Sequence, residues 1–164
     1  MERTLLVRKA TAADIQPLVG LMKSFYAEAG YGLDESEASA SFSSLLSHAA
    51  LGGAWIALLG QRPVGHAVLT TRYTMEHGGL SGYVDDLFVE NEHRQKGIAS
   101  RLLQELETEC LARGCKALIV EVGRNNPAGL AAYKKLGMKH VDDGRVLYRK
   151  LLRSEHPAQE RPRQ

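Results

Sequence analysis

The sequence predicts an α/β protein in which a mixed, mostly antiparallel sheet carries helices on both faces. One basis is a strand–helix–strand unit from Tyr83 to Val122, which should join two parallel strands by a right-handed crossover. Another is that the strands before this unit are separated by short turns, as antiparallel neighbours are. The chain has 164 residues, 44% of them hydrophobic and 24% charged, and is therefore long enough to bury the core of one domain.

Apolar periodicity defines the elements of the first third. Leu5–Arg8 reads as a short strand. Asp14 is placed to cap a helix that runs to about Ala27, with one apolar face made by Ile15, Leu18, Leu21, Met22 and Phe25. A second helical stripe covers Ser39–Leu51 after a segment broken by glycines.

Three strands are predicted in the middle of the chain. Ala54–Leu59 and Val64–Thr71 flank the turn Gly60–Pro63, which is typical of a hairpin. A second turn at His77–Gly79 leads into the strand Tyr83–Val89. These strands supply the antiparallel part of the sheet.

The next elements carry clear start and stop signals. A helix from Gly97 to Arg113 has one apolar face (Ile98, Leu102, Leu103, Leu106 and Cys110), and Gly114 ends it. Lys116–Val122 is almost wholly apolar, as expected of a strand covered on both faces. Asn126–Pro127 forms a good cap and first residue for a short helix that Gly137 ends.

A closing hairpin is predicted from Met138–Val141 and Arg145–Leu152. Beyond it the chain is polar and contains proline. Residues 1–153 are therefore expected to form one domain, and residues 154–164 a disordered polar tail.

Composition excludes several classes of function. A formal net charge of +2 gives no reason to expect nucleic acid or an anionic membrane as a partner. No apolar run approaches the ~20 residues of a membrane span, and the first residues lack the apolar core of a signal peptide. Cys110 and Cys115 fit neither a zinc spacing nor a disulfide framework, and the histidines form no metal-binding pair. We therefore expect a cytoplasmic protein without a metal.

The run from Asp85 to Ala99 is the most informative stretch. A strand passes through a short polar turn to Gly97, which opens the amphipathic helix. The first turn of a helix has backbone N–H groups without intrahelical partners, and the helix dipole is positive there, so this arrangement favours an anion such as phosphate. Arg94 and Lys96 add positive charge at the rim, whereas His93, next to Arg94, is either a further phosphate contact or, more simply, a solvated turn residue.

Two segments resemble motifs of the GNAT superfamily of acetyl-CoA-dependent N-acetyltransferases. Arg94-Gln95-Lys96-Gly97-Ile98-Ala99 resembles motif A, Arg/Gln-x-x-Gly-x-Gly/Ala after a strand. The segment from Asn126 to Met138 resembles motif B, in which an Asn precedes a Tyr by seven residues. The chain departs from the family pattern at Gln95, Gly129 and Met138, where glycine, alanine and phenylalanine are common.

The resemblance implies the GNAT fold, in which a splayed strand pair binds acetyl-CoA as cosubstrate. The pyrophosphate would lie on the motif A turn, and the pantetheine arm would lie in the gap beside the preceding strand. Asn126 and Tyr133 would also contact the coenzyme. The implied binding residues of the strand and the turn are Leu87, Phe88, Val89, Arg94, Gln95, Lys96, Gly97, Ile98, Ala99 and Ser100.

Acetyl transfer to an amine needs an acid for the departing thiolate and a base for the amine. Tyr133 matches the family's acid, since tyrosine is protonated at neutral pH; its helical spacing from Leu130 and Leu136 is equally typical of a packed core residue. Asp85 is the preferred base and Asp86 the second choice. Strand alternation cannot decide between them, because a β-bulge would change which face each one uses.

The acceptor is expected to be a small cationic primary amine, because acidic residues gather in the segments that shape the acceptor site in this family (Glu28, Asp34, Glu35, Glu37 and Glu76, with the two aspartates). The acidic run Asp34–Glu37 would equally suit a solvated helix start. One alternative function is acetylation of a protein N-terminus or lysine. Another is a regulatory module that binds acyl-CoA without turnover. The sequence leaves open whether the chain forms a homodimer.

Overall fold

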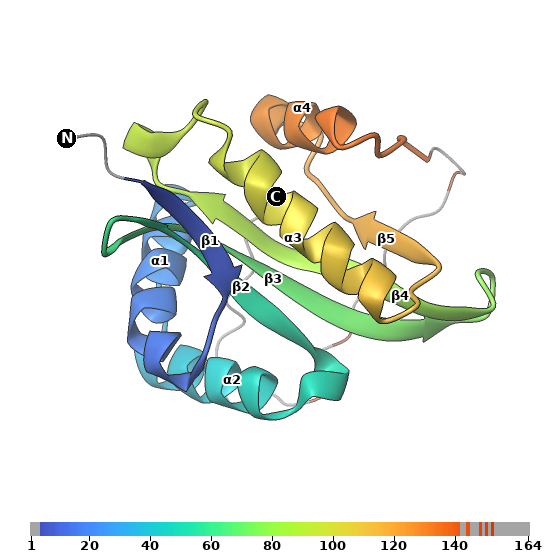
Figure 1. The fold of residues 1–164 in the computed structure, drawn as a ribbon, viewed down its shortest axis with the longest axis horizontal. Coiled ribbons are helices and arrows are strands. Elements are labelled where there is room, and N and C mark those ends of the chain that lie inside the picture. The colour runs from blue at the N-terminus through green and yellow to red at the C-terminus, as the bar shows by residue number, and fades with distance from the viewer. Residues whose placement is uncertain (1–3, 142–143, 145–147, 149, 151, 153–164) are drawn as a thin grey trace.

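The structure is a computed structural model that describes residues 4–141, 144, 148, 150 and 152 (Figure 1). None of the helices in these residues is long and apolar enough to cross a membrane. The elements are β1 (Leu5–Lys9), η1 (Ala12–Asp14), α1 (Ile15–Glu28), α2 (Glu35–Ser47), η2 (Ala49–Leu51), β2 (Gly52–Leu59), β3 (Arg62–Thr74), β4 (Gly79–Val89), η3 (Asn91–His93), α3 (Ile98–Ala112), β5 (Ala117–Val120) and α4 (Pro127–Lys135), where η marks a 3₁₀ helix.

The described strands form one sheet in the order β1-β2-β3-β4-β5. The pairs from β1 to β4 are antiparallel, and β4 pairs with β5 in parallel. The parallel pair is joined through α3, as the strand–helix–strand pattern predicts. The predicted mixed, mostly antiparallel sheet is confirmed.

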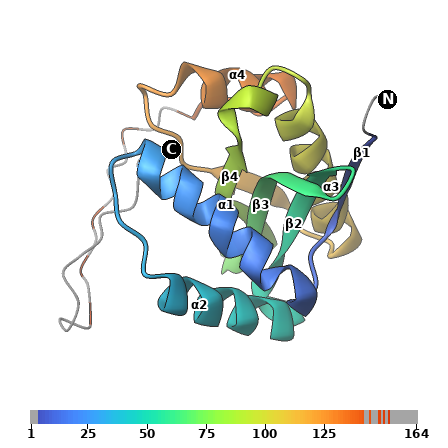
Figure 2. The same cartoon turned by 90° about the vertical axis from the view of Figure 1, so that its left-hand side faces the viewer.

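Helices cover both faces of this sheet. Figure 1 shows α3 lying along one face, and Figure 2 shows α1 and α2 on the other. Each face has its own apolar core. The α3 side includes Trp55, Leu69, Val84, Val89, Leu102, Leu103, Leu106 and Tyr133, and the opposite side includes Leu18, Val19, Phe42, Ile56, Val68 and Phe88.

Helix α1 begins at Ile15 with Asp14 as its N-cap residue, as predicted, but without the expected side-chain cap bond, and α2 begins earlier than predicted. The carboxylate of Asp14 makes no side-chain cap for α1; it accepts from Thr11 and from Arg8, whose two terminal nitrogens lie 2.8 Å from its oxygens. Helix α2 begins at Glu35, earlier than predicted, because Asp34 caps it by accepting from the N–H groups of Ser36 and Glu37. Part of the acidic run is thus a helix start.

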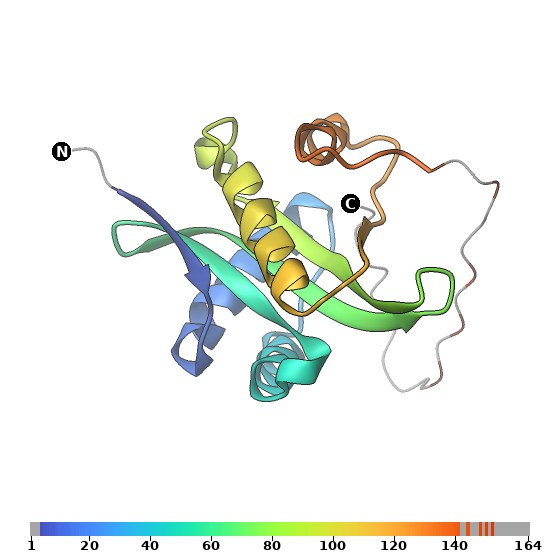
Figure 3. The ribbon, with the colours of Figure 1, turned by 45° about the vertical axis from the view of Figure 1, so that its right-hand side comes forward.

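The C-terminal strands also differ. Strand β5 is shorter than predicted and its residues are only half-buried, so the expectation of a strand covered on both faces is wrong for the described structure. Met138–Val141 is not a strand. Most of the second arm of the predicted hairpin, Arg145–Leu152, and the predicted tail 154–164 lie outside the described residues. By contrast, β3 and β4 are longer than predicted and form a hairpin that projects beyond the neighbouring strands (Figure 3).

A β-bulge interrupts the pairing of β3 and β4. Leu69 lies opposite Val84 and Val68 lies opposite Asp86, so Asp85 is the extra residue on β4. The parallel pairing of β4 with β5 ends at the same place, at Val84 and Val120. Beyond this point the last residues of β4 are paired with β3 on one side, and no strand of the described residues pairs with them on the other.

His66 is a buried titratable group that lies directly opposite Phe88 in the pairing of β3 with β4. It lies on β3, is 0% exposed, and its ring centroid lies 6.5 Å from that of Phe42 and 6.1 Å from that of Phe88. Neither ring nitrogen has a hydrogen-bond partner among the described residues. Because burial disfavours the charged imidazolium, the pKa of His66 falls from 6.5 to about 4.

This burial predicts that the protein loses stability in mild acid. The unfolded chain takes up the His66 proton below pH 6.5, whereas the folded chain does so only near pH 4. The free energy of unfolding should therefore fall through this window by about 3 kcal/mol more than in His66→Leu. Urea unfolding of both proteins at several pH values measures this difference. Parallel pH curves for the two proteins would show that His66 is not the cause.

Candidate active site

A cavity of about 560 Å³ opens beyond the point where β5 leaves β4. The end of β4, the loop before α3, the start of α3 and one side of α4 form its walls. Its lining comprises Phe25, Glu28, Leu87, Phe88, Val89, His93, Arg94, Gln95, Gly97, Ile98, Ala99, Ser100, Asn126, Ala128, Gly129, Ala131, Ala132, Tyr133 and Lys135. Among the residues predicted to bind the coenzyme, all but Lys96 line this cavity.

The N-terminus of α3 reaches the cavity wall without a side-chain cap. Its N-cap is Gly97, whereas Asp34 and Asn126 cap α2 and α4 with their side chains. Gly97 has a φ of +79°, a left-handed conformation that favours glycine, and a Cβ added there would point into open space. The first-turn N–H groups and the positive helix end thus provide donors for an anion in the cavity.

Gln95 adopts the left-handed conformation that glycine, the common residue of motif A here, adopts without strain. Its φ is +61°, and it is the one non-glycine residue with a positive φ in the described part of the chain. Such a conformation costs an L-residue roughly 1–2 kcal/mol. The loop therefore adopts at Gln95 a conformation that glycine would take at a lower cost.

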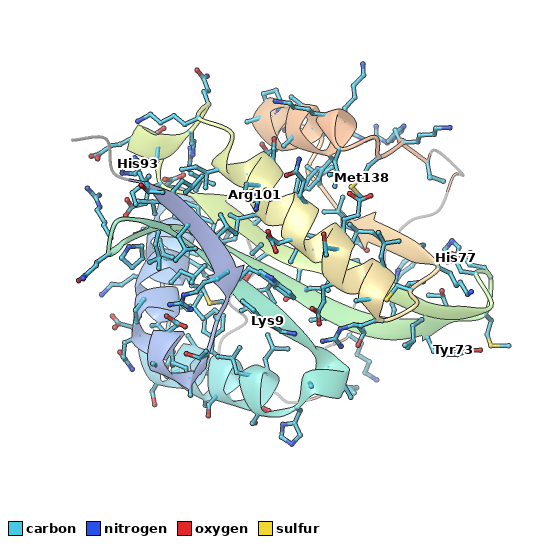
Figure 4. The ribbon with its side chains drawn as sticks, viewed as in Figure 1. Lys9, Tyr73, His77, His93, Arg101 and Met138 are labelled. Atoms are coloured by element: carbon cyan, nitrogen blue, oxygen red, sulfur yellow. The ribbon has the colours of Figure 1, made fainter. Side chains whose placement is uncertain are left out.

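The three basic residues near the turn have different surroundings. Arg94 donates from Nε to the Val89 carbonyl over 2.8 Å, and its other end pairs with Glu28. Lys96 donates to the Glu92 carbonyl over 2.8 Å instead of lining the cavity. His93, expected to be solvated, is half-buried in the loop before α3 (Figure 4), and its Nε2 lies 3.9 Å from a Glu90 oxygen. The interpretation of His93 as a solvated residue is therefore wrong.

Asn126 reaches the cavity from the start of α4. Its Oδ1 accepts from the N–H of Gly129 over 2.9 Å, which confirms the predicted cap. Oδ1, the acceptor of the side chain, is engaged in this bond. A ligand would therefore contact Asn126 through its side-chain NH₂ group, which donates. Pro127 follows as the first helical residue, as predicted.

Tyr133 both packs and faces the cavity. It is 6% exposed and belongs to the core on the α3 side of the sheet, and it also lines the cavity wall. Burial, with the negative charge of Asp86 and the nearby Tyr83, raises the pKa of Tyr133 to about 12. The hydroxyl is therefore protonated at neutral pH.

The bulge separates the surroundings of the two candidate bases. Asp86 is 7% exposed and its charge acts on Tyr133, whereas Asp85 is half-buried and its charge acts on Tyr83. Burial, together with hydrogen bonding to Glu121 and its charge, raises the pKa of Tyr83 to about 12. Neither aspartate is among the residues that line the cavity.

The structure disperses the acidic residues expected at the acceptor site. Glu28 lines the cavity. Glu35 and Glu37 lie in the first turn of α2, and Glu35 pairs with Lys23 of α1. Glu76 lies in the turn between β3 and β4, 3.8 Å from the ring of His77. The acidic run Asp34–Glu37 is thus the start of a helix.

Sequence reasoning missed several residues of the site. Phe25 was assigned only to the apolar stripe of α1, yet it lines the cavity with its ring centroid 5.5 Å from that of Phe88. Tyr83 and Glu121 flank the point of strand separation, and no motif in the sequence signals them. Lys135 follows Tyr133 by two residues on α4, and its place on the wall depends on how that helix is oriented.

Comparison with known proteins agrees with this geometry. A profile described as Acetyltransferase (GNAT) family matches residues 19–138. An integron cassette protein from the mobile metagenome of Cole Harbour Salt Marsh is 37% identical, with a TM-score of 0.80 over 90% of this chain and 91% of that one.

Two less similar structures share the fold. A predicted acetyltransferase with acetyl-CoA from Clostridium acetobutylicum is 24% identical, with a TM-score of 0.75 over 93% of this chain and 100% of that one. An aminoglycoside N-acetyltransferase in complex with CoA is 19% identical, with a TM-score of 0.79 over 90% of this chain and 95% of that one. With the profile match over most of its length and motifs A and B both placed on one cavity, this chain belongs to the GNAT family of acetyltransferases.

Proposed function

We propose that this protein transfers the acetyl group of acetyl-CoA directly to a small cationic primary amine. The observation that carries the proposal is that one cavity joins three features: an uncapped helix N-terminus, an open strand edge and a buried, protonated tyrosine. These suit the phosphates, the amide-bearing arm and the departing sulfur of the coenzyme, in that order.

The coenzyme would be held mainly by backbone groups. The first-turn N–H groups of α3 would bind the pyrophosphate, and Gly97 leaves room for it. Leu87, Phe88 and Val89 would pair with the pantetheine arm, as an additional strand pairs with a sheet edge. A backbone N–H of β4 would also polarise the thioester carbonyl.

In the transfer, the amine nitrogen bonds to the acetyl carbon and the carbon–sulfur bond breaks. Tyr133 would give its proton to the departing thiolate. Its raised pKa keeps the hydroxyl protonated throughout the neutral range, so the proton is available for this step. The amine loses a proton to a carboxylate. We assign that role to Asp86 in preference to Asp85, the residue favoured from the sequence, because Asp86 is the more buried of the two and its charge acts on Tyr133.

A cationic acceptor fits the charge around the strand separation. Asp85, Asp86 and Glu121 lie there with Tyr83, and Arg72 is the nearby cation, 5.1 Å from the Tyr83 ring. An excess of negative charge attracts an ammonium group. A neighbour of the same fold is named an aminoglycoside N-acetyltransferase, and aminoglycosides are cationic amines.

Gly97→Glu tests the phosphate turn. Acetyl-CoA should raise the melting temperature of the wild-type protein, because a ligand that binds only the folded state stabilises it. Gly97→Glu should abolish this rise, since it places a carboxylate where the pyrophosphate must lie. Glu105→Gln, which removes one charge from an ion pair on α3, is the control, and acetyl-CoA should still raise its melting temperature. An undiminished shift in Gly97→Glu would place the coenzyme elsewhere.

Tyr133→Phe tests the acid. The variant removes one hydroxyl and keeps the ring in the core, so the melting temperature and the coenzyme Kd should change little. Loss of a positioned acid typically lowers kcat by ~10²–10⁴, with KM nearly unchanged. Tyr73→Phe, at an exposed position on the β3–β4 hairpin, is the matched control. A kcat equal to wild type in Tyr133→Phe would leave Tyr133 with its packing role alone.

Asp86→Asn and Asp85→Asn form a matched pair that tests the base. Asp86→Asn should lower kcat most near neutral pH and less at high pH, where more of the amine is already neutral. Asp85→Asn should have the smaller effect at every pH. The pH profiles of both variants with one amine measure this, and the reverse order would return the role to Asp85.

A further inference from the structure

Glu28 and Arg94 form an ion pair on the wall of the coenzyme cavity. Nη2 of Arg94 lies 2.5 Å from Oε2 of Glu28, and both residues line the cavity. Glu28 is the last residue of α1, whereas Arg94 is the first residue of the motif A turn. The pair therefore joins the helix on one face of the sheet to the proposed phosphate site.

The Arg94 guanidinium is fixed at its other end. Its Nε donates to the Val89 carbonyl over 2.8 Å, and its central carbon lies 5.7 Å from the Phe88 ring centroid. These contacts hold the charge beside the uncapped start of α3. An anion that arrives there must share Arg94 with Glu28 or replace it.

We propose that Glu28 is an internal competitor of the coenzyme's pyrophosphate for Arg94. In the empty site the carboxylate neutralises Arg94. In the loaded site the more highly charged pyrophosphate takes over the guanidinium, and Glu28 recaptures Arg94 as coenzyme A leaves. Glu28 thus weakens coenzyme affinity and speeds release of the product coenzyme. This inference rests on the proposed coenzyme site.

The displacement is feasible because the pair is accessible. The side chains of Glu28 and Arg94 are both partly exposed, 44% and 39% respectively. Exposed ion pairs contribute little free energy, since water screens them. The competition is therefore expected to change the coenzyme Kd by about two- to five-fold.

A double-mutant cycle on binding of coenzyme A tests the proposal. Calorimetry gives the Kd and stopped-flow mixing gives the dissociation rate, both at 0.15 M salt, where charges beyond about 8 Å are screened. Glu28→Gln should lower the Kd about two- to five-fold and slow dissociation. Arg94→Gln should raise the Kd, and adding Glu28→Gln to Arg94→Gln should then change it by less than a factor of about 1.5. Glu105→Gln, which removes the same charge from a pair on α3, should leave the Kd unchanged.

Three outcomes would overturn the proposal. A weaker affinity in Glu28→Gln would mean that Glu28 positions Arg94 for the coenzyme. An unchanged affinity would mean that the pair does not compete. If Glu28→Gln increased coenzyme affinity as much in the Arg94→Gln protein as in the wild type, Glu28 would act by repelling the phosphates and not by competing for Arg94. Absence of coenzyme A binding in the wild-type protein would instead refute the proposed function itself, so the two failures are distinguishable.

Discussion

The separation of β4 from β5 is the constraint on which the rest of the site depends. The two strands pair only from Ser81–Ala117 to Val84–Val120, and the pairing stops where Asp85 forms a bulge against β3. The bulge shifts the alternation of β4, so Leu87 and Val89 belong to the core under α3, while Phe88 belongs to the opposite core. At the same place, therefore, the pairing with β5 ends, the side chains that follow change face, and the edge of β4 has no strand partner among the described residues.

Tyr133 shows how the fold and the proposed chemistry share one side chain. Its ring belongs to the core that α3 covers, and the same burial raises the pKa of its hydroxyl to about 12. A packed ring and a protonated hydroxyl are therefore two consequences of one position on α4. The sequence left open whether Tyr133 is a packed core residue or the proposed acid, and the structure allows it to be both.

Local patterns were sufficient to predict most of the fold. The apolar face of α3, the end of that helix at Gly114, the cap at Asn126 and the mixed sheet all follow from periodicity and from glycine, proline and asparagine chemistry. Predictions failed where a side chain had another partner available. The Asp14 carboxylate binds Arg8 instead of making a cap bond to α1, and α2, which Asp34 caps, begins at Glu35, four residues before the predicted stripe.

The site could be predicted only as far as its motifs extend. Motifs A and B identify the turn, Asn126 and Tyr133, because backbone donors and their spacing are local properties. The Glu28–Arg94 pair, the burial of His93 and the place of Tyr83 beside the bulge depend on how distant elements meet. No pattern along the chain contains that information.

A crystal structure of the protein with coenzyme A would test the proposed binding mode. Density for the pantetheine arm is expected along Leu87–Val89, on the edge of β4 beyond β5, with the pyrophosphate on the N–H groups of Gln95–Ser100. Density for the coenzyme outside the cavity between β4 and α4, or a pyrophosphate away from the start of α3, would contradict that binding mode.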